Sequence, residues 1–397
     1  MSVMARRPLV RWVVPGAVLA AVVGAGVVAS TQAGASPDLP PRTAAQLLVD
    51  VYTARLDGAS GTVVERADLG LPALPDAIAG AGSSTDLNSL ITGSHTLRVW
   101  YSGPDKARVA LLGATGESDL IRNGQDLWIW SSSGNTAQHT KLGGAAQNKT
   151  LPVDPSQLPV SPQQAADMIL SALNPTTSVS LGPTTTVAGR GAYQLVVAPK
   201  DTRSLVERVT IAVDAQKRVP TQVQVFAKGS GTPAFKIGFD QVNFTRPDAS
   251  RFQFTPPPGT KVNEADQDQN KAPGQGPNTL PALPSGKDQK QLPAQPSGQD
   301  KTMVVGTGWT SVLVARLPEA AAAPGGKPST GAPASALGDL GPLLNNLPTV
   351  SGSWGSGRLL QARLFSVLIT DDGRILIGPV SGQQLATVAG DPAAALK

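Results

Sequence analysis

Two histidines, His95 and His139, are the side chains of this chain that could act as general bases or zinc ligands. Either chemistry needs a partner, such as a second ligand or a carboxylate that orients the ring. Neither histidine has an acidic or histidine partner at ligand spacing in the sequence. Acids such as Glu65, Asp119 and Asp126 are scattered, and nothing in the sequence pairs two of them. The sequence therefore predicts that both histidines are ordinary surface or core residues.

Other catalytic motifs are also missing from the sequence. There is no cysteine, which excludes disulfides, thiolate zinc sites and thiol catalysis. There is no G-x-S-x-G, H-E-x-x-H or P-loop sequence. Asp371-Asp372-Gly373 lies between two apolar runs, which is typical of a hairpin turn rather than of paired catalytic carboxylates. We expect no cofactor, no metal and no enzyme activity; an extracytoplasmic hydrolase, with a site assembled from unrelated loops, is the remaining alternative.

The first 35 residues have the composition of an export signal. Arg6, Arg7 and Arg11 form a basic region, residues 12–30 are apolar, and Ala33-Gly34-Ala35 offers an A-x-A cleavage site. An uncleaved membrane anchor formed by the same apolar residues is the alternative, because the run just reaches the length that spans a bilayer. Either interpretation places the rest of the chain outside the cytoplasm, in a periplasm-like space or secreted.

The charge of the chain argues against nucleic acid as a partner. The formal net charge is +5, and loss of the three arginines of the export signal would lower it to about +2. The remaining lysines and arginines form no clustered stripe of the kind that follows a phosphate backbone.

Alternating residues between positions 191 and 260 carry the main structural signal. Four short runs alternate apolar with polar or small residues and are separated by turn residues; in one run Val209, Ile211 and Val213 share a side. A period of two over short runs predicts antiparallel strands with one buried face. Similar runs begin at Gly58 and resume at Ser94, and Asn123-Gly124 is a type I′ hairpin signal.

Two helices and an insertion accompany the strands. Residues 42–56 predict a helix capped by Thr43, with Ala45, Leu48, Val49 and Tyr52 on one face. A second helix is expected over residues 161–173, and residues 70–93 interrupt the strand pattern as an insertion or flap. The order of helix, strands, helix, strands is not a βαβ alternation, so an α+β fold is expected, with a curved, mainly antiparallel sheet and helices on one face.

The C-terminal third divides into a linker and a second unit. Residues 263–300 lack aromatic residues and are rich in Pro, Gly and Gln, which predicts a disordered linker. Residues 301–397 predict a smaller α+β domain with about four strands and a terminal helix.

An apolar concave face is the candidate binding site of the main domain, residues 36–262. A strongly curved sheet must fill such a face with its own side chains, with covering helices or with a hydrophobic guest. A sealed ordinary core is therefore the alternative to a cavity. Alternation alone predicts the lining as Leu97, Val99, Val109, Leu111, Trp128, Trp130, Leu195, Val197, Val209, Ile211, Val213, Val223, Val225, Ile237 and Phe239.

The end of the main domain resembles the LolA family of lipoprotein carriers, in which a strand before a proline leads to an apolar strand and an F-x-F-x-x-P-x-G close. The segment G-Q-D-L-W-I-W, residues 124–130, is similar to the family's G-x-x-L-W-x-Y strand. The resemblance covers roughly residues 40–262 and implies a half-open β-barrel closed by helices, with a cavity for acyl chains or lipid. The matching positions at the end are Pro220, Ile237, Phe239, Val242, Phe252, Phe254, Pro257, Gly259 and Val262.

The second unit resembles the small domain of RseB/MucB proteins, which regulate an anti-sigma factor. Ile377, Gly378 and Val380 match a strand pair ending in a V-G-x-V-P-like turn, whereas Pro379 stands where that family has an acid and the final proline is missing. The resemblance implies an exported carrier or chaperone that buries acyl chains of lipids or lipoproteins at the membrane surface, gated by residues 70–93. The alternative is an envelope-stress sensor that binds a membrane-anchored anti-sigma factor.

Overall fold

The computed structural model describes residues 37–71, 90, 93–113, 116–142, 175–265, 302–316 and 347–391. The chain divides into two compact units. The first unit comprises Met1–Asp268 together with Thr307–Thr310 and Ala362–Leu364, and the second unit comprises the remainder. None of the helices in the described ranges has the length and hydropathy that a membrane span requires. The expected export signal, most of the insertion expected over residues 70–93, the helix at 161–173 and most of the linker expected over residues 263–300 lie outside the described residues. Residues 263–265 are an exception: they were expected in the disordered linker, but they belong to strand β12 (Lys261–Ala265).

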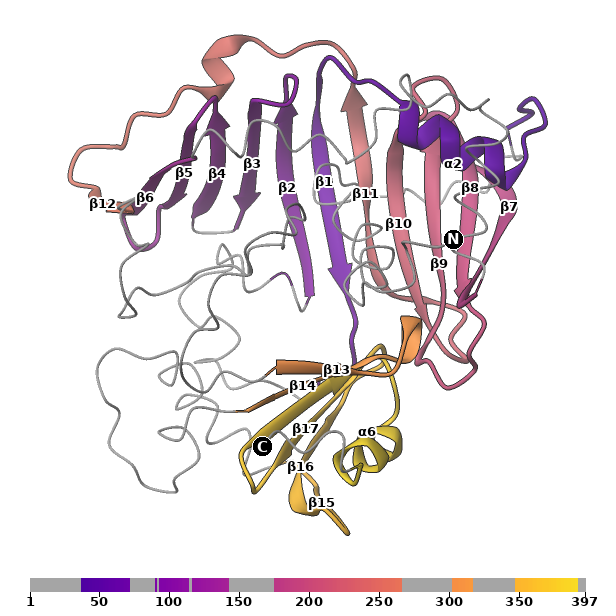
Figure 1. Cartoon of the computed structure of the whole chain (residues 1–397). Helices are drawn as coiled ribbons and strands as arrows, with labels where there is room; N and C mark the ends of the chain where they lie inside the picture. Colours follow the sequence, from indigo (N-terminus) through magenta and orange to yellow (C-terminus); the bar gives the residue numbers. More distant parts are fainter. Residues whose placement is uncertain are drawn as a thin grey trace, which may run out of the picture. The chain divides into compact units, whose positions relative to one another are not determined.

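A large sheet dominates the first unit (Figure 1). Its order is β12-β6-β5-β4-β3-β2-β1-β11-β10-β9-β8-β7, so within the described residues it is open, with β12 and β7 as its edges. Neighbouring strands are antiparallel except for β12 and β6, which are parallel. The strands are β1 (Ala59–Ala67), β2 (Gly93–Tyr101), β3 (Lys106–Leu112), β4 (Glu117–Asn123), β5 (Asp126–Ser131), β6 (Thr136–Lys141), β7 (Thr177–Val187), β8 (Arg190–Pro199), β9 (Val206–Asp214), β10 (Pro220–Ala227), β11 (Pro233–Asn243) and β12 (Lys261–Ala265).

The strands predicted from residues 191–260 are confirmed as β8 to β11. Within β9, Val209, Ile211 and Val213 share one face, as a period of two requires. Thr210 and Ala212 of the other face are buried too, so the expectation of a single buried face is wrong for this strand. After β11 the chain forms a short 3-10 helix, η5 (Ala249–Phe252), and then an extended segment that reaches β12.

We call residues 249–265 the strap, because they lead from β11 to the far edge of the sheet beside β6 (Figure 1). Phe252 is 1% exposed, and the ring of Phe254 lies 5.3 Å from Trp128 and 6.0 Å from Trp130. Asn135 fixes the turn before β12, because its Nδ2 donates to the carbonyl oxygen of Gly259 at 3.0 Å. The F-x-F-x-x-P-x-G segment is therefore a covering element rather than a strand.

Helix α2 (Ala44–Thr53) begins at Thr43, as predicted, with a capping box formed by Thr43 and Gln46. Its buried face overlaps the predicted one in part. Ala45 is buried and Leu48 packs on the core, as predicted, but Leu47, at 1% exposed, is the most buried residue of the helix and Val51 packs beside it. Among the described residues α2 is the one α-helix of the first unit, so the expectation of a sheet covered by helices is not supported there.

The two hairpin turns predicted at Asn123-Gly124 and at Asp371–Gly373 can be compared with the structure. The β4–β5 hairpin exists, but Asn123 pairs with Asp126, so Gly124 and Gln125 occupy the centre of the turn. Gly124 has φ +65°, which fits a turn with glycine first and replaces the predicted type I′ centre. The predicted turn at Asp371–Gly373 is confirmed between β17 (Ser366–Thr370) and β18 (Arg374–Gly378).

The second unit is a six-stranded antiparallel sheet with the order β13-β14-β18-β17-β16-β15 and one α-helix, α6, among its described residues. Buried residues of α6, including Leu385 and Val388, pack on Val314, Leu368 and Leu376 of the sheet. The α+β class is confirmed, and the described residues contain two more strands than expected. The remaining elements are β13 (Thr302–Val305), β14 (Val312–Arg316), β15 (Thr349–Gly352), β16 (Gly355–Gln361) and α6 (Gly382–Ala389).

Candidate functional site

A single face of the large sheet gathers thirteen of the fifteen residues predicted to line the binding site. Directly opposed residues of neighbouring strands share a face, so the ladder can be followed from strand to strand. It connects β3 to β2 and β1, then β11, β10, β9 and β8. The thirteen residues, which we call the apolar face, are Leu97, Val99, Val109, Leu111, Leu195, Val197, Val209, Ile211, Val213, Val223, Val225, Ile237 and Phe239.

Trp128 and Trp130 do not belong to the apolar face. Trp128 opposes Ile121, which in turn opposes Arg108, and Trp130 opposes Asp119; all of these residues lie on the other side of the sheet. The expectation that these tryptophans line the same surface as Leu97 and its neighbours is therefore wrong. Both indoles are instead covered by Phe254 of the strap.

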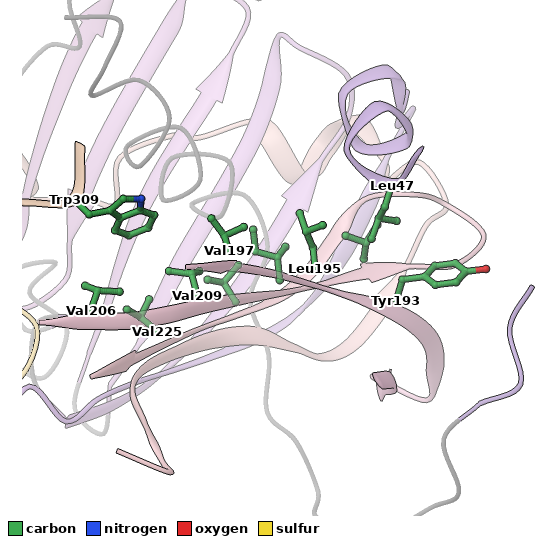
Figure 2. Packing of buried hydrophobic residues seen from close by; sticks show 11 residues of the cluster. Leu47, Tyr193, Leu195, Val197, Val206, Val209, Val225 and Trp309 are labelled. Atoms are coloured by element: carbon green, nitrogen blue, oxygen red, sulfur yellow. The ribbon is translucent and has the colours of Figure 1, made fainter. Parts of the chain in front are cut away.

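The half of the apolar face on β8 to β10 packs against other parts of the first unit. Leu195, Val197 and Val209 lie between Leu47 of α2 and Trp309, which approach from opposite ends (Figure 2). The exposed fractions of these five side chains range from 1% to 8%. In this conformation the apolar side chains are buried by contacts within the protein.

Trp309 is a residue of this site that sequence reasoning missed. It lies in the 3-10 turn η6 (Gly308–Thr310), and its Nε1 donates a hydrogen bond to Oγ1 of Thr177 at 2.9 Å. Gly308 has φ +63°, and a side chain there would collide with Thr176 at 2.8 Å from the added Cβ. The sequence signal was the G-T-G-W segment, in which two glycines precede a lone aromatic residue.

The other half of the apolar face lies on β1 to β3 and β11. Val63, Leu97, Leu111 and Phe239 form a buried row across these strands. Gly61 makes this packing possible, because a Cβ at that position would lie 2.8 Å from the Phe239 ring. Substitution of Gly61 would displace the ring from the row.

One ion pair interrupts the apolar face. Glu65 is 2% exposed, and its Oε2 lies 2.9 Å from Nδ1 of His95 on the neighbouring strand. Burial raises the pKa of Glu65, and the hydrogen bond and charge of His95 oppose that shift. The sequence shows no acidic partner of His95 at ligand spacing, and strand pairing supplies one from 30 positions away.

The opposite face carries a second buried carboxylate, Asp119, which forms an ion pair with Arg108. The pKa of Asp119 is raised to about 6, because burial, together with the charge of Glu117, outweighs the lowering effect of Arg108. Within the described residues, Asp119 Oδ1, Arg108 Nε and Trp130 Nε1 have no hydrogen-bond partner. Buried groups of this kind commonly share ordered water.

His139 also has acidic partners that its sequence spacing did not reveal. Its Nδ1 lies 2.7 Å from Glu264 Oε2 and its Nε2 lies 2.9 Å from Asp126 Oδ1. Asp126 belongs to β5 and Glu264 to β12, so the pairing joins three strands. In the part of the chain that the structure describes, no group of three His, Cys, Asp or Glu side chains is arranged to hold a metal.

The chemistry offered by the apolar face is therefore contact and desolvation. A row of valine, leucine, isoleucine and phenylalanine side chains has no nucleophile and no paired acid and base. Such a surface gains free energy when it excludes water, and it is non-directional, so it suits aliphatic chains of varied length. The polar exceptions within it are Glu65 and His95.

Comparisons with known proteins found similarity in solved structures only. No protein-family model matches the chain, and no curated protein matches it in sequence. MucB of Pseudomonas aeruginosa in complex with MucA is 16% identical, with a TM-score of 0.41, 87% of this chain covered and 96% of that chain. A LolA-superfamily protein of Nitrosomonas europaea is 12% identical, with a TM-score of 0.21, 54% of this chain covered and 99% of that chain.

A further similar structure is a lipoprotein-sorting protein domain from Vibrio parahaemolyticus, at 9% identity and a TM-score of 0.20, with 52% of this chain covered and 94% of that chain. These identities and TM-scores are too low to transfer a function from those proteins, so the function of this chain must be argued from its own residues.

Proposed function

We propose that this protein is an exported, non-enzymatic carrier or chaperone that binds acyl chains of lipids or lipoproteins on the apolar face of its large sheet. One observation supports the proposal above the others: the thirteen residues of the apolar face are continuous across β3, β2, β11, β10, β9 and β8, with Val63 of β1 completing the row. An ordinary sandwich would bury such a face against a second sheet.

The energetics favour an aliphatic guest. Each CH₂ group removed from water stabilises a complex by about 0.8 kcal/mol, so ten buried methylenes are worth roughly 8 kcal/mol before the costs of ordering. Leu47 and Trp309 now cover part of the apolar face. A bound acyl chain would replace their apolar contacts with apolar contacts of its own. The difference in free energy between the two states is then small, so binding is reversible.

Lipid content is the direct test. Organic extracts of the protein, purified from an exporting host, should contain lipid by mass spectrometry, and the delipidated protein should take up a fluorescent fatty acid. Two substitutions on the apolar face, Val109→Ser and Ile237→Ser, should weaken uptake. Val64→Ser is the matched control, because Val64 is half-buried on the opposite face, opposite Gly238. Absence of extracted lipid together with no uptake would overturn the proposal.

A second candidate function is a sensor that binds a membrane-anchored anti-sigma factor through the second unit. The supporting observation is an exposed apolar row on three neighbouring strands. Val304 opposes Leu313, and Leu313 opposes Ile377; the three side chains are 42%, 39% and 39% exposed. Large apolar side chains gathered on a solvent-facing sheet are typical of a protein-binding surface.

A pull-down from solubilised membranes separates the two candidates. A sensor should retain one membrane protein, identified by mass spectrometry, and should lose it when Leu313→Asp and Ile377→Asp are combined. Val262→Asp is the control, because Val262 is equally exposed, at 42%, but belongs to the first unit. Retention of the same proteins by all variants would count against the sensor.

Export is part of the proposal and has its own measurement. If residues 1–35 are removed, N-terminal sequencing of the exported protein should begin at Ser36. If residues 12–30 remain as an anchor, the protein should instead sediment with membranes and keep its first residues. Recovery from the cytoplasm alone would contradict both forms.

A further inference from the structure

Glu65 occupies the centre of the apolar face. It is on β1, with Val63 two residues before it and Ala67 two residues after it, all three buried on one side of the strand. Across the strand boundaries it opposes His95 on β2 and Ile237 on β11. A carboxylate therefore stands in the middle of a surface made otherwise of aliphatic and aromatic side chains.

Only one of the two carboxylate oxygens of Glu65 has a hydrogen-bond partner among the described residues. Oε2 contacts Nδ1 of His95 at 2.9 Å, whereas Oε1 is buried and has no hydrogen-bond partner among the residues that the structure describes. Burying a charged oxygen without a hydrogen bond is unfavourable. A leucine at position 65 would continue the apolar face without that penalty.

A role in stability alone does not explain why the Glu65–His95 ion pair is buried in the apolar face. Glu65 and His95 join two strands that their backbone ladder already pairs along nine residues. Buried ion pairs usually contribute little over apolar residues of similar size. Glu65 is 2% exposed, so the pair lies in a poorly solvated place, and this burial raises the pKa of Glu65. Oε1, which has no partner among the described residues, is thus the atom of the pair that is left to meet a ligand.

We infer that Glu65, held by His95, binds the polar end of the acyl ligand and selects headgroups that donate hydrogen bonds. This inference rests on the proposed acyl-binding function and adds a ligand class to it. A hydroxyl or ammonium group can donate to Oε1, while the alkyl chain packs on Val63, Leu97 and Phe239. A headgroup with acceptors alone would leave Oε1 unpaired, and an anionic headgroup would be repelled.

Three single-chain detergents, used below their micelle concentrations, distinguish these classes by isothermal calorimetry. Dodecyl maltoside donates through hydroxyls, dodecylamine donates through an ammonium group, and dodecyldimethylamine oxide at slightly alkaline pH has an acceptor only. The exported protein should bind one or both donor probes at least about tenfold more tightly than the amine oxide, the factor expected of a hydrogen bond to a charged group. The better donor probe identifies hydroxyl or ammonium as the source.

Glu65→Leu should abolish this preference, by weakening the donor probes about tenfold while leaving the amine oxide unchanged or tighter. Glu65→Gln retains a carbonyl acceptor and should show an intermediate preference. Asp119→Asn is the matched control: Asp119 is also 2% exposed with one unpartnered oxygen, but it lies on the opposite face. Its preference for donor probes should equal that of the wild type.

The test compares the affinity for the donor probes with the affinity for the amine oxide, and each possible result supports or overturns the inference. Equal binding of all three probes by the wild type, or an unchanged ratio in both Glu65 variants, overturns the headgroup inference and leaves acyl binding intact. The same loss of preference in Asp119→Asn also overturns it, because the effect would then be general to buried carboxylates. Failure of the wild type to bind any probe overturns the proposed function and the inference together.

Discussion

His139 lies flat on the indole of Trp128, with ring centroids 4.1 Å apart and 13° between the planes. In this position its two nitrogens contact Asp126 of β5 and Glu264 of β12. A protonated imidazole can donate to both carboxylates, whereas a neutral one has a single N–H. One side chain thereby joins the last antiparallel hairpin of the sheet to the parallel strand that ends the strap.

Replacement of His139 should loosen β12 selectively. His139→Phe keeps the aromatic stack and removes both polar contacts; both carboxylates are largely solvated, so global stability should fall by no more than about 1 kcal/mol. Amide hydrogen exchange should accelerate over Lys261–Ala265 and stay unchanged in β8 to β10. Gln138→Ala, on the other face of β6, is the control. Unchanged protection of β12 would show that the backbone ladder alone holds it.

Asp119 should make the protein less stable as pH rises. Its folded pKa of about 6 lies above the ordinary value of 3.8, so the folded state binds a proton more tightly than the unfolded state. The contribution is complete below about pH 4 and is lost by about pH 6, amounting to about 1–3 kcal/mol. Urea unfolding across this range should show the decline, and Asp119→Asn should flatten it. A decline of the same size in Asp119→Asn would assign it to other groups.

The Arg190–Asp214 pair should matter far more than exposed pairs. Burial raises the pKa of Asp214, but hydrogen bonds from Arg190 and the Lys217 backbone outweigh it and lower the pKa overall. Arg190→Met leaves a carboxylate that is 1% exposed without its cation, and should cost about 3–5 kcal/mol in urea unfolding.

Two variants check that assignment. Adding Asp214→Asn to Arg190→Met should recover part of the loss, because no unpaired charge remains buried. Arg203→Ala removes the partner of Asp201 at an exposed position and should leave the unfolding midpoint unchanged. Equal losses in Arg190→Met and Arg203→Ala would argue against burial as the cause.

The hydrogen bond from Trp309 to Thr177 can be measured by a double-mutant cycle. Trp309→Phe keeps most of the ring packing on Val209 and Val225, and Thr177→Val removes the acceptor at a position that is 3% exposed. Each change should destabilise the protein, and the coupling between them should be about 1 kcal/mol. Additive losses would mean that the two side chains do not interact in solution.

Much of the sheet could be predicted from the sequence, and its lining could be predicted only in part. Alternation tells which residues of one strand share a face, and that was sufficient for Val209, Ile211 and Val213 in β9. It does not tell which face of one strand continues which face of the next. Trp128 and Trp130 were misplaced for this reason, because the ladder through β3 and β4 joins their side of β5 to Arg108 and Asp119.

The polar partners escaped prediction because they depend on long-range pairing. Glu264 meets His139 across 125 residues of sequence, and this happens only because the strap returns to β6 in a parallel direction. Glu65 meets His95 through a strand pair that encloses the insertion at residues 70–93. Spacing rules find ligands within one helix or turn, and they are silent about contacts that topology creates.

The two borders of the large sheet have a consequence for the protein in concentrated solution. A free strand edge is a template on which a second copy can polymerise. At β7 the ladder shifts between Gly182 and Thr185, and Pro183 has no N–H to offer. At the other border β12 is five residues long and carries the charges of Lys261 and Glu264. Both borders are thus poor seeds for fibrils, although the sheet is wide and, within the described residues, open.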